Sequence, residues 1–193
     1  MKKFLLATHN KGKLREITEI LNNRYELSPP PPDYIAPPET GTTFKENAFI
    51  KAKALHDKYK TPVIADDSGI IVPSLNNEPG IYSARYAGKN AIDEENNQKL
   101  LFELENKQNR DAYYECVICC ILSEEDIIFS NGKCYGTISK TYAGGNGFGY
   151  DPYFIEKSTG ISFGNLAPNI KNEISHRALA LKELKRLLEG KNF

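Results

Sequence analysis

The first residues of the chain join a short apolar segment directly to an amphipathic one, and this junction limits the fold more than any other feature. Residues 2–8, KKFLLAT, are typical of a β-strand, and Asn10 is a suitable N-cap for a helix over residues 11–23, KGKLREITEILNN. The apolar residues on one face of this helix are Leu14, Ile17 and Leu21. A strand that passes at once into an amphipathic helix is typical of α/β proteins.

The alternation of strands and helices continues along the chain. The proline-rich residues 27–41, LSPPPPDYIAPPETG, predict an extended loop or an edge segment. A capping box over residues 43–46, TFKE, predicts the start of a helix. VIADDSGIIV, residues 63–72, has the character of a buried strand, and residues 73–90 predict a loop before a helix that ends near Asn106. The inward-facing residues of that helix are expected to be Leu100, Leu101 and Leu104.

The second half of the chain adds further strands and a final helix. Residues 113–141 are expected to form antiparallel strands, with SEED (123–126) and SNGK (130–133) as turn signals. A glycine-rich loop, YAGGNGFGYDP, then leads to a short strand, YFIEK, and the last helix lies near ISHRALALKELKRLLEG. Because we find no internal repeat and no long linker, we expect one α/β domain with a mixed sheet over residues 1–193.

The charge balance of the chain excludes several classes of protein. Its 193 residues include 25 Lys and Arg against 25 Asp and Glu, a formal net charge of zero. Bulk electrostatics therefore favour neither a long nucleic acid nor an anionic membrane, and any phosphate site must be local. The start, MKKFLLATHNKGK, lacks the features of a signal peptide, and no apolar run approaches the ~20 residues of a membrane helix. We expect a soluble, cytoplasmic protein.

The cysteines invite a zinc site, which the strand pattern argues against. Cys116 and Cys119 form a C-x-x-C, and Cys120 follows at once within the apolar segment YYECVICCIL. Successive side chains on a strand alternate between faces, so Cys116 and Cys120 should share one face and Cys119 should lie on the other. These residues are expected to be inert core thiols.

The segment THNKGK, residues 8–13, lies where the first strand meets the first helix. Free backbone N–H groups and the positive end of the helix dipole meet at such a junction, and Lys11 and Lys13 add cations. The spacing is not that of a P-loop, because Leu14 follows Gly12-Lys13 and the upstream glycine is missing. The residues alone leave two interpretations open, a phosphate site or a solvated helix start.

The glycine-rich loop does not match the dinucleotide-binding fingerprint. Tyr150 stands where a glycine is required, and the dipeptide Asp151-Pro152 blocks a following helix. The loop carries the rings of Phe148 and Tyr150, and aromatic rings beside a phosphate site suggest a stacked base. The alternative is a hairpin turn whose aromatic side chains pack in the core.

Two adjacent carboxylates, Asp66 and Asp67, interrupt the apolar strand over residues 63–72. Burying an ionised carboxylate is costly, so such a pair usually meets a cation, a metal or a ring of donors. Neighbours on an extended segment point to opposite faces, and only one of them can readily enter a shared site.

These motifs, taken with ISHR, resemble one enzyme family. The chain contains, in consistent order from Leu6 to the last helix, ATHNKGKLREI, TGTTFKENAFIKAKAL, ADDSG, PGIYSARYAG, FGYDPYF and KNEISHRALAL. This set is similar to the inosine and xanthosine triphosphate pyrophosphatases, which hydrolyse nonstandard purine nucleoside triphosphates (ITP, dITP, XTP) to the monophosphate and pyrophosphate. The resemblance implies an elongated mixed sheet with flanking helices, two lobes around a central nucleotide cleft, a Mg²⁺ requirement and a homodimer.

The resemblance distinguishes the two aspartates. It implies that Asp67 is the catalytic residue, which binds Mg²⁺ and orients or deprotonates the attacking water, while Ser68 contacts the phosphates. Asp66 is then expected to be structural and to accept hydrogen bonds from loop amides. For the second metal ligand the resemblance favours Glu39, although Pro38 stands where relatives often have a further Glu.

The remaining assignments concern the two ends of the nucleotide. The resemblance implies that the phosphates meet Lys51, which would otherwise be interpreted as a solvated lysine, and the helix start. The residues of the helix start are Thr8, His9, Asn10, Lys11, Gly12 and Lys13. On the base side it implies Phe148, Gly149, Tyr150 and Asp151, with Phe148 as the stacking ring, and it assigns base recognition to Lys171, His176 and Arg177. Without the resemblance, a His-Arg pair at a helix start would be a capping or surface feature.

Two other functions stay open from the sequence. One is that of the related septum-formation-inhibitor family, house-cleaning pyrophosphatases that act on modified pyrimidine or methylated nucleotides. Members of that family would not be expected to carry YSARYAG and ISHR, which this chain has. The other is a nucleotide-binding module without catalysis, in which Asp67 only neutralises a bound ion.

Overall fold

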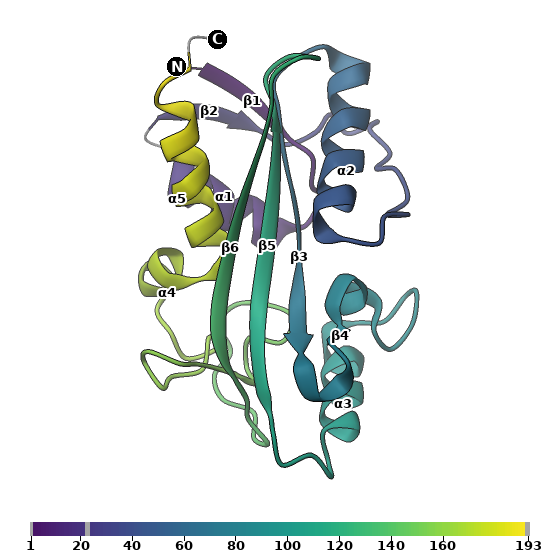
Figure 1. Ribbon diagram of the computed structural model, residues 1–193, viewed down its shortest axis with the longest axis vertical. Helices are drawn as coiled ribbons and strands as arrows, with labels where there is room; N and C mark the ends of the chain where they lie inside the picture. Colours follow the sequence, from purple (N-terminus) through teal and green to yellow (C-terminus); the bar gives the residue numbers. More distant parts are fainter. Residues whose placement is uncertain (1, 22–23, 192–193) are drawn as a thin grey trace. The chain divides into compact units, whose positions relative to one another are not determined.

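The computed structural model describes residues 2–21 and 24–191 and has a mixed α/β fold, as predicted (Figure 1). Its seven-stranded sheet has the order β2-β1-β3-β5-β6-β7, with β4 beside β3. The strands are β1 (Lys2–Leu6), β2 (Tyr25–Ser28), β3 (Val63–Val72), β4 (Glu78–Pro79), β5 (Asp111–Ile121), β6 (Ile127–Ile138) and β7 (Phe154–Glu156). The helices are α1 (Lys11–Leu21), α2 (Phe44–Tyr59), α3 (Asp93–Glu103), α4 (Pro168–Ile174), α5 (His176–Leu188) and the short 3₁₀ turns η1 (Pro73–Leu75) and η2 (Gly80–Arg85).

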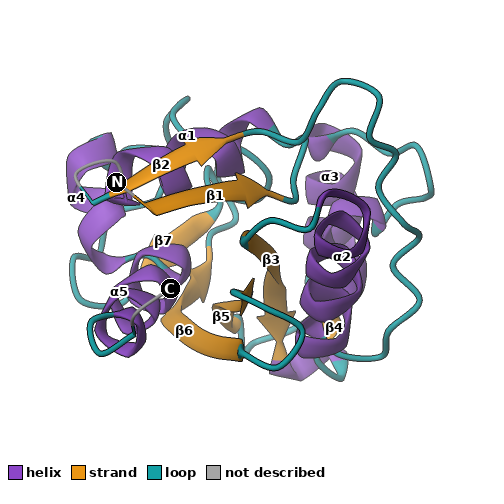
Figure 2. Ribbon diagram, turned by 90° about the horizontal axis from the view of Figure 1, so that it is seen from above, coloured by secondary structure: helices purple, strands orange, loops and turns teal. Residues whose placement is uncertain are grey.

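The sheet is mixed in direction. β1 pairs in parallel with both β2 and β3, and Figure 2 shows β1 and β2 side by side with the same direction. β3 pairs antiparallel with β4, and β6 pairs antiparallel with β7. β5 and β6 are neighbours joined by the predicted SEED turn, in which the N–H of Asp126 donates to the carbonyl of Ser123. Such a short connection makes the pair a hairpin.

The chain separates into two compact units. The first consists of Met1–Asp67, Cys116–Gly132 and His176–Phe193, and the second of Ser68–Glu115 and Lys133–Ser175. Strands β3, β5 and β6 contribute residues to both units. The expectation of one domain over residues 1–193 stays a prediction. Within the described residues, no helix has the length and apolar character that crossing a bilayer requires.

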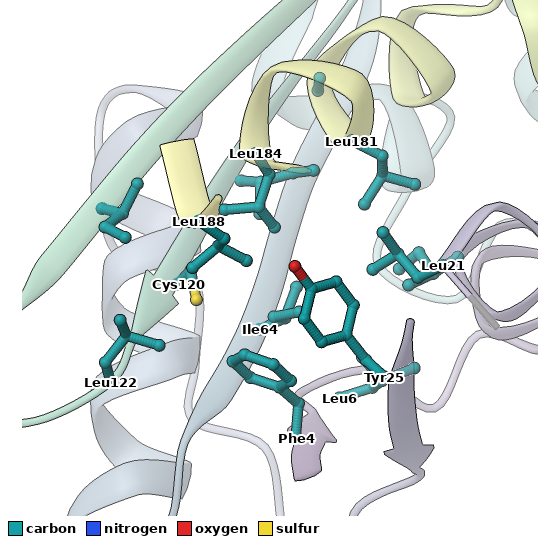
Figure 3. Packing of buried hydrophobic residues seen from close by; sticks show 14 of the residues in the cluster. Phe4, Leu6, Leu21, Tyr25, Ile64, Cys120, Leu122, Leu181, Leu184 and Leu188 are labelled. Atoms are coloured by element: carbon teal, nitrogen blue, oxygen red, sulfur yellow. The ribbon is translucent and has the colours of Figure 1, made fainter. Parts of the chain in front are cut away.

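The core of the first unit lies on both faces of its strands. One face carries residues from α1 and α5, including Leu21, Leu181 and Leu184, packed on Phe4 and Ile64 (Figure 3). The other face carries residues from α2, among them Ala48, Ala52 and Leu55. The cysteines follow the predicted alternation, because Cys116 and Cys120 belong to the first cluster and Cys119 to the second. All four thiols of the chain are buried and free, which confirms the prediction of core cysteines.

The second unit has an aromatic core beside α3. Tyr114, Phe154 and Phe163 pack against one another, with the Tyr114 and Phe154 ring centroids 4.8 Å apart. From α3 and the residue after it, Leu100 and Leu104 are fully buried, as predicted. Leu101 is only partly buried.

The turn predicted at SNGK is wrong, because β6 runs without interruption through residues 130–133. Gly132 has a different role from that of a turn residue. A Cβ on Gly132 would lie 2.2 Å from the carbonyl oxygen of His176 and 2.5 Å from the backbone nitrogen of Ala180. The glycine therefore lets α5 approach the backbone of β6, which is the other common reason for glycine within a strand.

Other predicted boundaries move by a few residues. The loop predicted to begin at residue 27 starts only after β2, and the helix predicted to end near Asn106 ends at Glu103. The first helix is described to Leu21, so its predicted end at residue 23 lies outside the described residues. α4 was not predicted, because Pro168 and Ser175 confine it to seven residues, too short for a periodic pattern. Figure 1 shows this short helix just before α5.

The predicted capping box forms in a modified way. Thr43 is the N-cap of α2, and its hydroxyl accepts the N–H of Glu46 at 3.1 Å. The carboxylate of Glu46 accepts the N–H of Thr42 at 2.6 Å, one residue further upstream than in the usual box. α2 therefore begins at Phe44, where the sequence predicts it.

Candidate functional site

One cluster in the first unit brings together the predicted catalytic acid and its partners. Lys51 projects from α2, Asp67 from β3 and Glu39 from the loop before α2. The Nζ of Lys51 lies 2.9 Å from Glu39 Oε1 and 2.9 Å from Asp67 Oδ1. Lys51 is buried, so the interpretation as a solvated lysine is wrong. We call Glu39, Lys51 and Asp67 the lysine-bridged cluster.

The electrostatics of this cluster raise two pKa values. Burial raises the pKa of Asp67, and the charge of Glu39 adds to this effect, while Lys51 and Lys13 act in the opposite direction. For Lys51, burial favours the neutral amine, but the charges of Asp67, Asp66 and Glu39 outweigh it and raise the pKa. Lys51 is therefore a cation at neutral pH, and the pKa of Asp67 lies above that of an ordinary aspartate.

The cluster contains an oxygen suited to a metal. Asp67 Oδ2 is buried and has no hydrogen-bond partner within residues 2–21 and 24–191. A buried carboxylate oxygen without a donor is the kind of ligand that a hard divalent cation takes, and Glu39 adds a second carboxylate nearby. Among the described residues, no group of three or more His, Cys, Asp or Glu side chains is arranged so that it could hold a metal ion. Asp67 and Glu39 are therefore the residues of this cluster whose chemistry fits a divalent cation.

A second buried network lies around Asp66. Asp66 Oδ2 is 2.9 Å from Lys13 Nζ and 3.2 Å from Arg177 Nη2, and Arg177 Nη1 also pairs with Glu16. Burial opposes ionisation of Asp66, but Lys13, Arg177 and Lys51 outweigh it and hold its pKa well below the usual range. Lys13 and Arg177 are charged side chains, whereas the sequence predicted loop amides as the partners of Asp66. We call Lys13, Glu16, Asp66 and Arg177 the Asp66 network.

The two aspartates have different partners, as strand alternation predicts. Asp66 contacts side chains of α1 and α5, whereas Asp67 contacts α2. Glu16 is a member of the network that sequence reasoning missed. It lies three residues after Lys13, and such a spacing places both charges on the same side of α1 beside Ile17. The sequence signal for a buried Glu16 was its position directly before Ile17, a residue of the apolar face of this helix.

The helix start at residues 8–13 has the predicted local structure. Asn10 caps α1, because its Oδ1 accepts the N–H of Lys13 at 3.0 Å. The N–H of Asn10 donates to Thr8 Oγ1 at 3.2 Å, and His9 Nε2 lies 3.2 Å from the carbonyl of Tyr34. Lys11 is exposed and Gly12 is half-buried. The segment thus presents one exposed lysine, Lys11, while Lys13 is paired with Asp66.

The predicted base-side loop forms a second cluster, in the second unit. Asp151 is buried, and its Oδ2 accepts the N–H of Phe148 at 2.9 Å and the ammonium of Lys171 at 2.7 Å. The Nζ of Lys171 lies 5.1 Å from the centre of the Phe148 ring. Tyr150 is buried and donates its hydroxyl to the carbonyl of Ser83 at 2.7 Å. Phe148, the predicted stacking ring, is only half-buried.

The predicted site residues therefore fall into both units. Thr8 to Lys13, Glu39, Lys51, Asp67, His176 and Arg177 belong to the first, and Ser68, Phe148 to Asp151 and Lys171 to the second. Arg177 is buried in the Asp66 network, and His176 is buried at the start of α5. The predicted joint action of Lys171, His176 and Arg177 on a base stays a prediction, as does the cleft between the lobes.

Comparison with known proteins gives a consistent match over nearly the whole chain. A sequence model of the Ham1 family matches residues 4–187. A protein of Legionella pneumophila (strain Paris) named dITP/XTP pyrophosphatase is 43% identical over 192 residues, which cover 97% of this chain and 99% of that protein. A protein of Aquifex aeolicus with the same name is 41% identical and covers 97% of each chain.

Solved structures support the fold. The Ham1 protein of Staphylococcus aureus superposes with a TM-score of 0.88 at 40% identity, covering 99% of this chain and 100% of the other. A HAM1 protein from Coxiella burnetii gives a TM-score of 0.91 at 39% identity with the same coverage. Both similarities extend over the two units described above.

Proposed function

This chain belongs to the Ham1 family, and we propose that it hydrolyses nonstandard purine nucleoside triphosphates (ITP, dITP, XTP) to the monophosphate and pyrophosphate. The observation that carries the proposal is the lysine-bridged cluster, in which the buried carboxylate of Asp67 lies 2.9 Å from the ammonium of Lys51 and its pKa is raised by burial. The relatives named dITP/XTP pyrophosphatase give the substrate class.

The triphosphate would be bound by residues of the first unit. The N-terminus of α1 offers free backbone N–H groups and a positive dipole end to an anion. Lys11 and Lys13 supply charge there, and Lys51 supplies it at the lysine-bridged cluster. Ser68 follows Asp67 directly in β3 and, as the resemblance implies, would also contact the phosphates.

The metal would be Mg²⁺, held by Asp67 and Glu39 as the two carboxylate ligands. When bound, Mg²⁺ supplies positive charge that stabilises the charge developing on phosphate oxygens. Asp67 orients the attacking water and accepts its proton, a role suited to a carboxylate whose pKa burial has raised. The ammonium of Lys51 contacts the carboxylates of both Glu39 and Asp67, so it offsets the repulsion between them and fixes the orientation of both.

The base would be read by the second cluster and by the start of α5. As the family resemblance implies, Phe148 would stack on the purine, and Lys171, His176 and Arg177 would donate toward the carbonyl oxygen at position six. For Arg177 this requires an exchange of its contacts with Glu16 and Asp66. Hypoxanthine and xanthine present that oxygen, whereas adenine presents an amino donor in its place. Donors facing a donor would leave polar groups unpaired, which disfavours ATP.

The remaining parts of the proposal concern assembly and location. We propose that both units act as one catalytic domain and that the protein is a homodimer, as the family resemblance implies. Four buried free thiols suit a reducing compartment, and the substrates arise in the cellular nucleotide pool, so the cytoplasm is the proposed location. Light scattering of the purified protein tests the dimer.

A panel of nucleotides tests the substrate class. The proposal predicts kcat/KM values for ITP, dITP and XTP that exceed those for ATP and GTP by at least about 10²-fold, in the presence of Mg²⁺. A higher value for a modified pyrimidine or methylated nucleotide would favour the septum-formation-inhibitor type of activity. The relatives' names do not favour that alternative. Binding without turnover of any triphosphate would favour the non-catalytic module.

A further inference from the structure

The segment that carries Phe148 has an unusual backbone. Gly147 and Gly149 adopt φ values of +81° and +62°, in the left-handed region. A Cβ on Gly149 would meet nothing within 4 Å, so only the backbone conformation requires glycine there. Glycine has many accessible conformations, so other contacts must select this one.

Those contacts come from one face of α3. The N–H of Gly149 donates to Asp93 Oδ2 at 2.6 Å, and the carbonyl of Gly149 accepts from Asn97 Nδ2 at 2.9 Å. Asp93 and Asn97 are four residues apart, so they lie on one helical face a single turn apart. Both polar groups of Gly149 are thus bound by α3, directly beside Phe148. We call Asp93 and Asn97 the α3 clamp.

The two halves of the clamp differ in environment. Asn97 is 4% exposed and its hydrogen bond to Gly149 is partly buried, so losing it leaves a partly buried carbonyl without its donor. Asp93 is exposed, and water can replace part of its contribution. The charge of Asp93 also favours the N-terminus of α3. Asn97 should therefore have the larger effect on the loop.

We propose that Asp93 and Asn97 are positioning residues for the purine base, because they fix Gly149 and thereby the ring of Phe148. This inference rests on the proposed function, in which Phe148 stacks on the base. Neither residue touches the substrate in this account. A preorganised ring binds a base with less loss of conformational entropy than a mobile one.

The absence of tryptophan from the sequence provides a direct probe of the ring. In the full-length chain, Phe148→Trp introduces a single tryptophan, which can be excited apart from the tyrosines and whose time-resolved anisotropy measures local motion without any substrate. Asn97→Ala and Asp93→Ala should increase that motion. Asp93→Asn, which keeps an acceptor for the Gly149 N–H, should increase it less than Asp93→Ala. Glu94→Ala, in the same first turn of α3, is the matched control.

Kinetics then test whether the clamp acts through Phe148. With Phe148 in place, Asn97→Ala should raise KM for ITP by about three- to tenfold, with kcat changed less than about twofold. In a Phe148→Ala background the same substitution should change KM less than about twofold, because the ring it positions is gone. A purely structural role would instead lower the melting temperature equally in both backgrounds.

The outcomes separate the two levels of the proposal. Unchanged anisotropy in Asn97→Ala, or equal KM effects with and without Phe148, overturns the positioning role. If the wild type releases no pyrophosphate from ITP, the proposed function fails. The anisotropy and the equilibrium binding of ITP then test the positioning role of the α3 clamp. Greater motion at position 148 together with weaker ITP binding in Asn97→Ala supports that role, and greater motion with unchanged binding overturns it.

Discussion

Lys51 and Asp67 form a buried ion pair, with 2.9 Å between the ammonium nitrogen and Asp67 Oδ1. This contact uses one carboxylate oxygen and leaves the other, Oδ2, without a hydrogen-bond partner among the described residues. The pair therefore holds Asp67 in a fixed orientation and keeps one oxygen available for water or a metal.

Asp67→Asn should reduce kcat for pyrophosphate release from ITP by about 10²–10³-fold, because preorganised charge acts mainly on the transition state. ITP binding should survive in part, since the phosphate and base contacts remain. Steady-state kinetics and calorimetric binding measure the two effects separately. Asp57→Asn, an exposed acid of α2, is the control. Wild-type turnover by Asp67→Asn would show that the proposed mechanism is wrong.

Lys13→Ala should raise KM for ITP, XTP and ATP by the same factor, about 10-fold or more. The substitution removes a positive charge of the protein that would contact the triphosphate, which is common to all three nucleotides. Competition assays with these nucleotides measure the factor. Lys107→Ala, an exposed lysine of the second unit, should leave all three unchanged. A changed base preference in Lys13→Ala would place the helix start at the other end of the nucleotide.

Asp66→Asn should lower the free energy of unfolding by about 3–5 kcal/mol at neutral pH, because it leaves Arg177 incompletely paired in the interior. The folded pKa of Asp66 lies below the unfolded value of about 3.9. Its stabilisation is therefore complete above the unfolded pKa and is lost as the pH falls toward the folded one.

Urea unfolding of the wild type and Asp66→Asn from about pH 7 to about pH 3 measures this effect. The difference between the two proteins should be constant near neutrality and should shrink at the acid end. Asp57→Asn, whose carboxylate is exposed beside Lys53, should change stability little. A difference that grows as the pH falls would contradict the assigned charge state of Asp66.

Arg177→Ala should narrow the ratio of kcat/KM for ITP over ATP, chiefly by slowing ITP. Each unpaired donor costs ~1–3 kcal/mol, so two mismatches supply roughly 10²–10⁴ in specificity. Phe148→Ala should lower kcat/KM for ITP and for ATP by more similar factors, because any purine offers a ring face for stacking. Arg177 also pairs with Glu16 and Asp66, so thermal unfolding must accompany the kinetics. An unchanged ratio with lost stability would assign Arg177 a structural role alone.

Gly132→Ala should destabilise the protein by about 1–3 kcal/mol, because the added methyl group would clash with the backbone of α5. Gly145→Ala is the matched control, since a Cβ there would meet nothing within 4 Å. Thermal or urea unfolding compares the two variants. Equal stability of both would mean that α5 shifts freely against β6.

The sequence predicted the α/β class, the positions of the main elements and the separation of the two aspartates. These features follow from local periodicity and strand alternation, which the residues alone determine. Gly132 was wrongly assigned to a turn, because a glycine within SNGK is a local turn signal. Glycine is needed there because α5, which is distant in the chain, approaches the backbone of β6. Local rules cannot report such a contact.

The same limit applies to the candidate site. The residues of the lysine-bridged cluster were all predicted, through the family resemblance, but the bridging position of Lys51 between two carboxylates was not. Glu16 and Asn97 were missed because their partners, Arg177 and Gly149, are remote in sequence. From sequence alone, a polar residue on a helix is predicted to be solvent-exposed unless its tertiary partner is known.

The products formed from ITP show which phosphoanhydride bond the enzyme cleaves. The purified protein is incubated with ITP and Mg²⁺, and the phosphorus-containing products are separated and quantified by ³¹P NMR. We expect IMP and pyrophosphate in equal amounts, with no orthophosphate formed at early times. Release of IDP and orthophosphate, or the absence of any turnover, would contradict it.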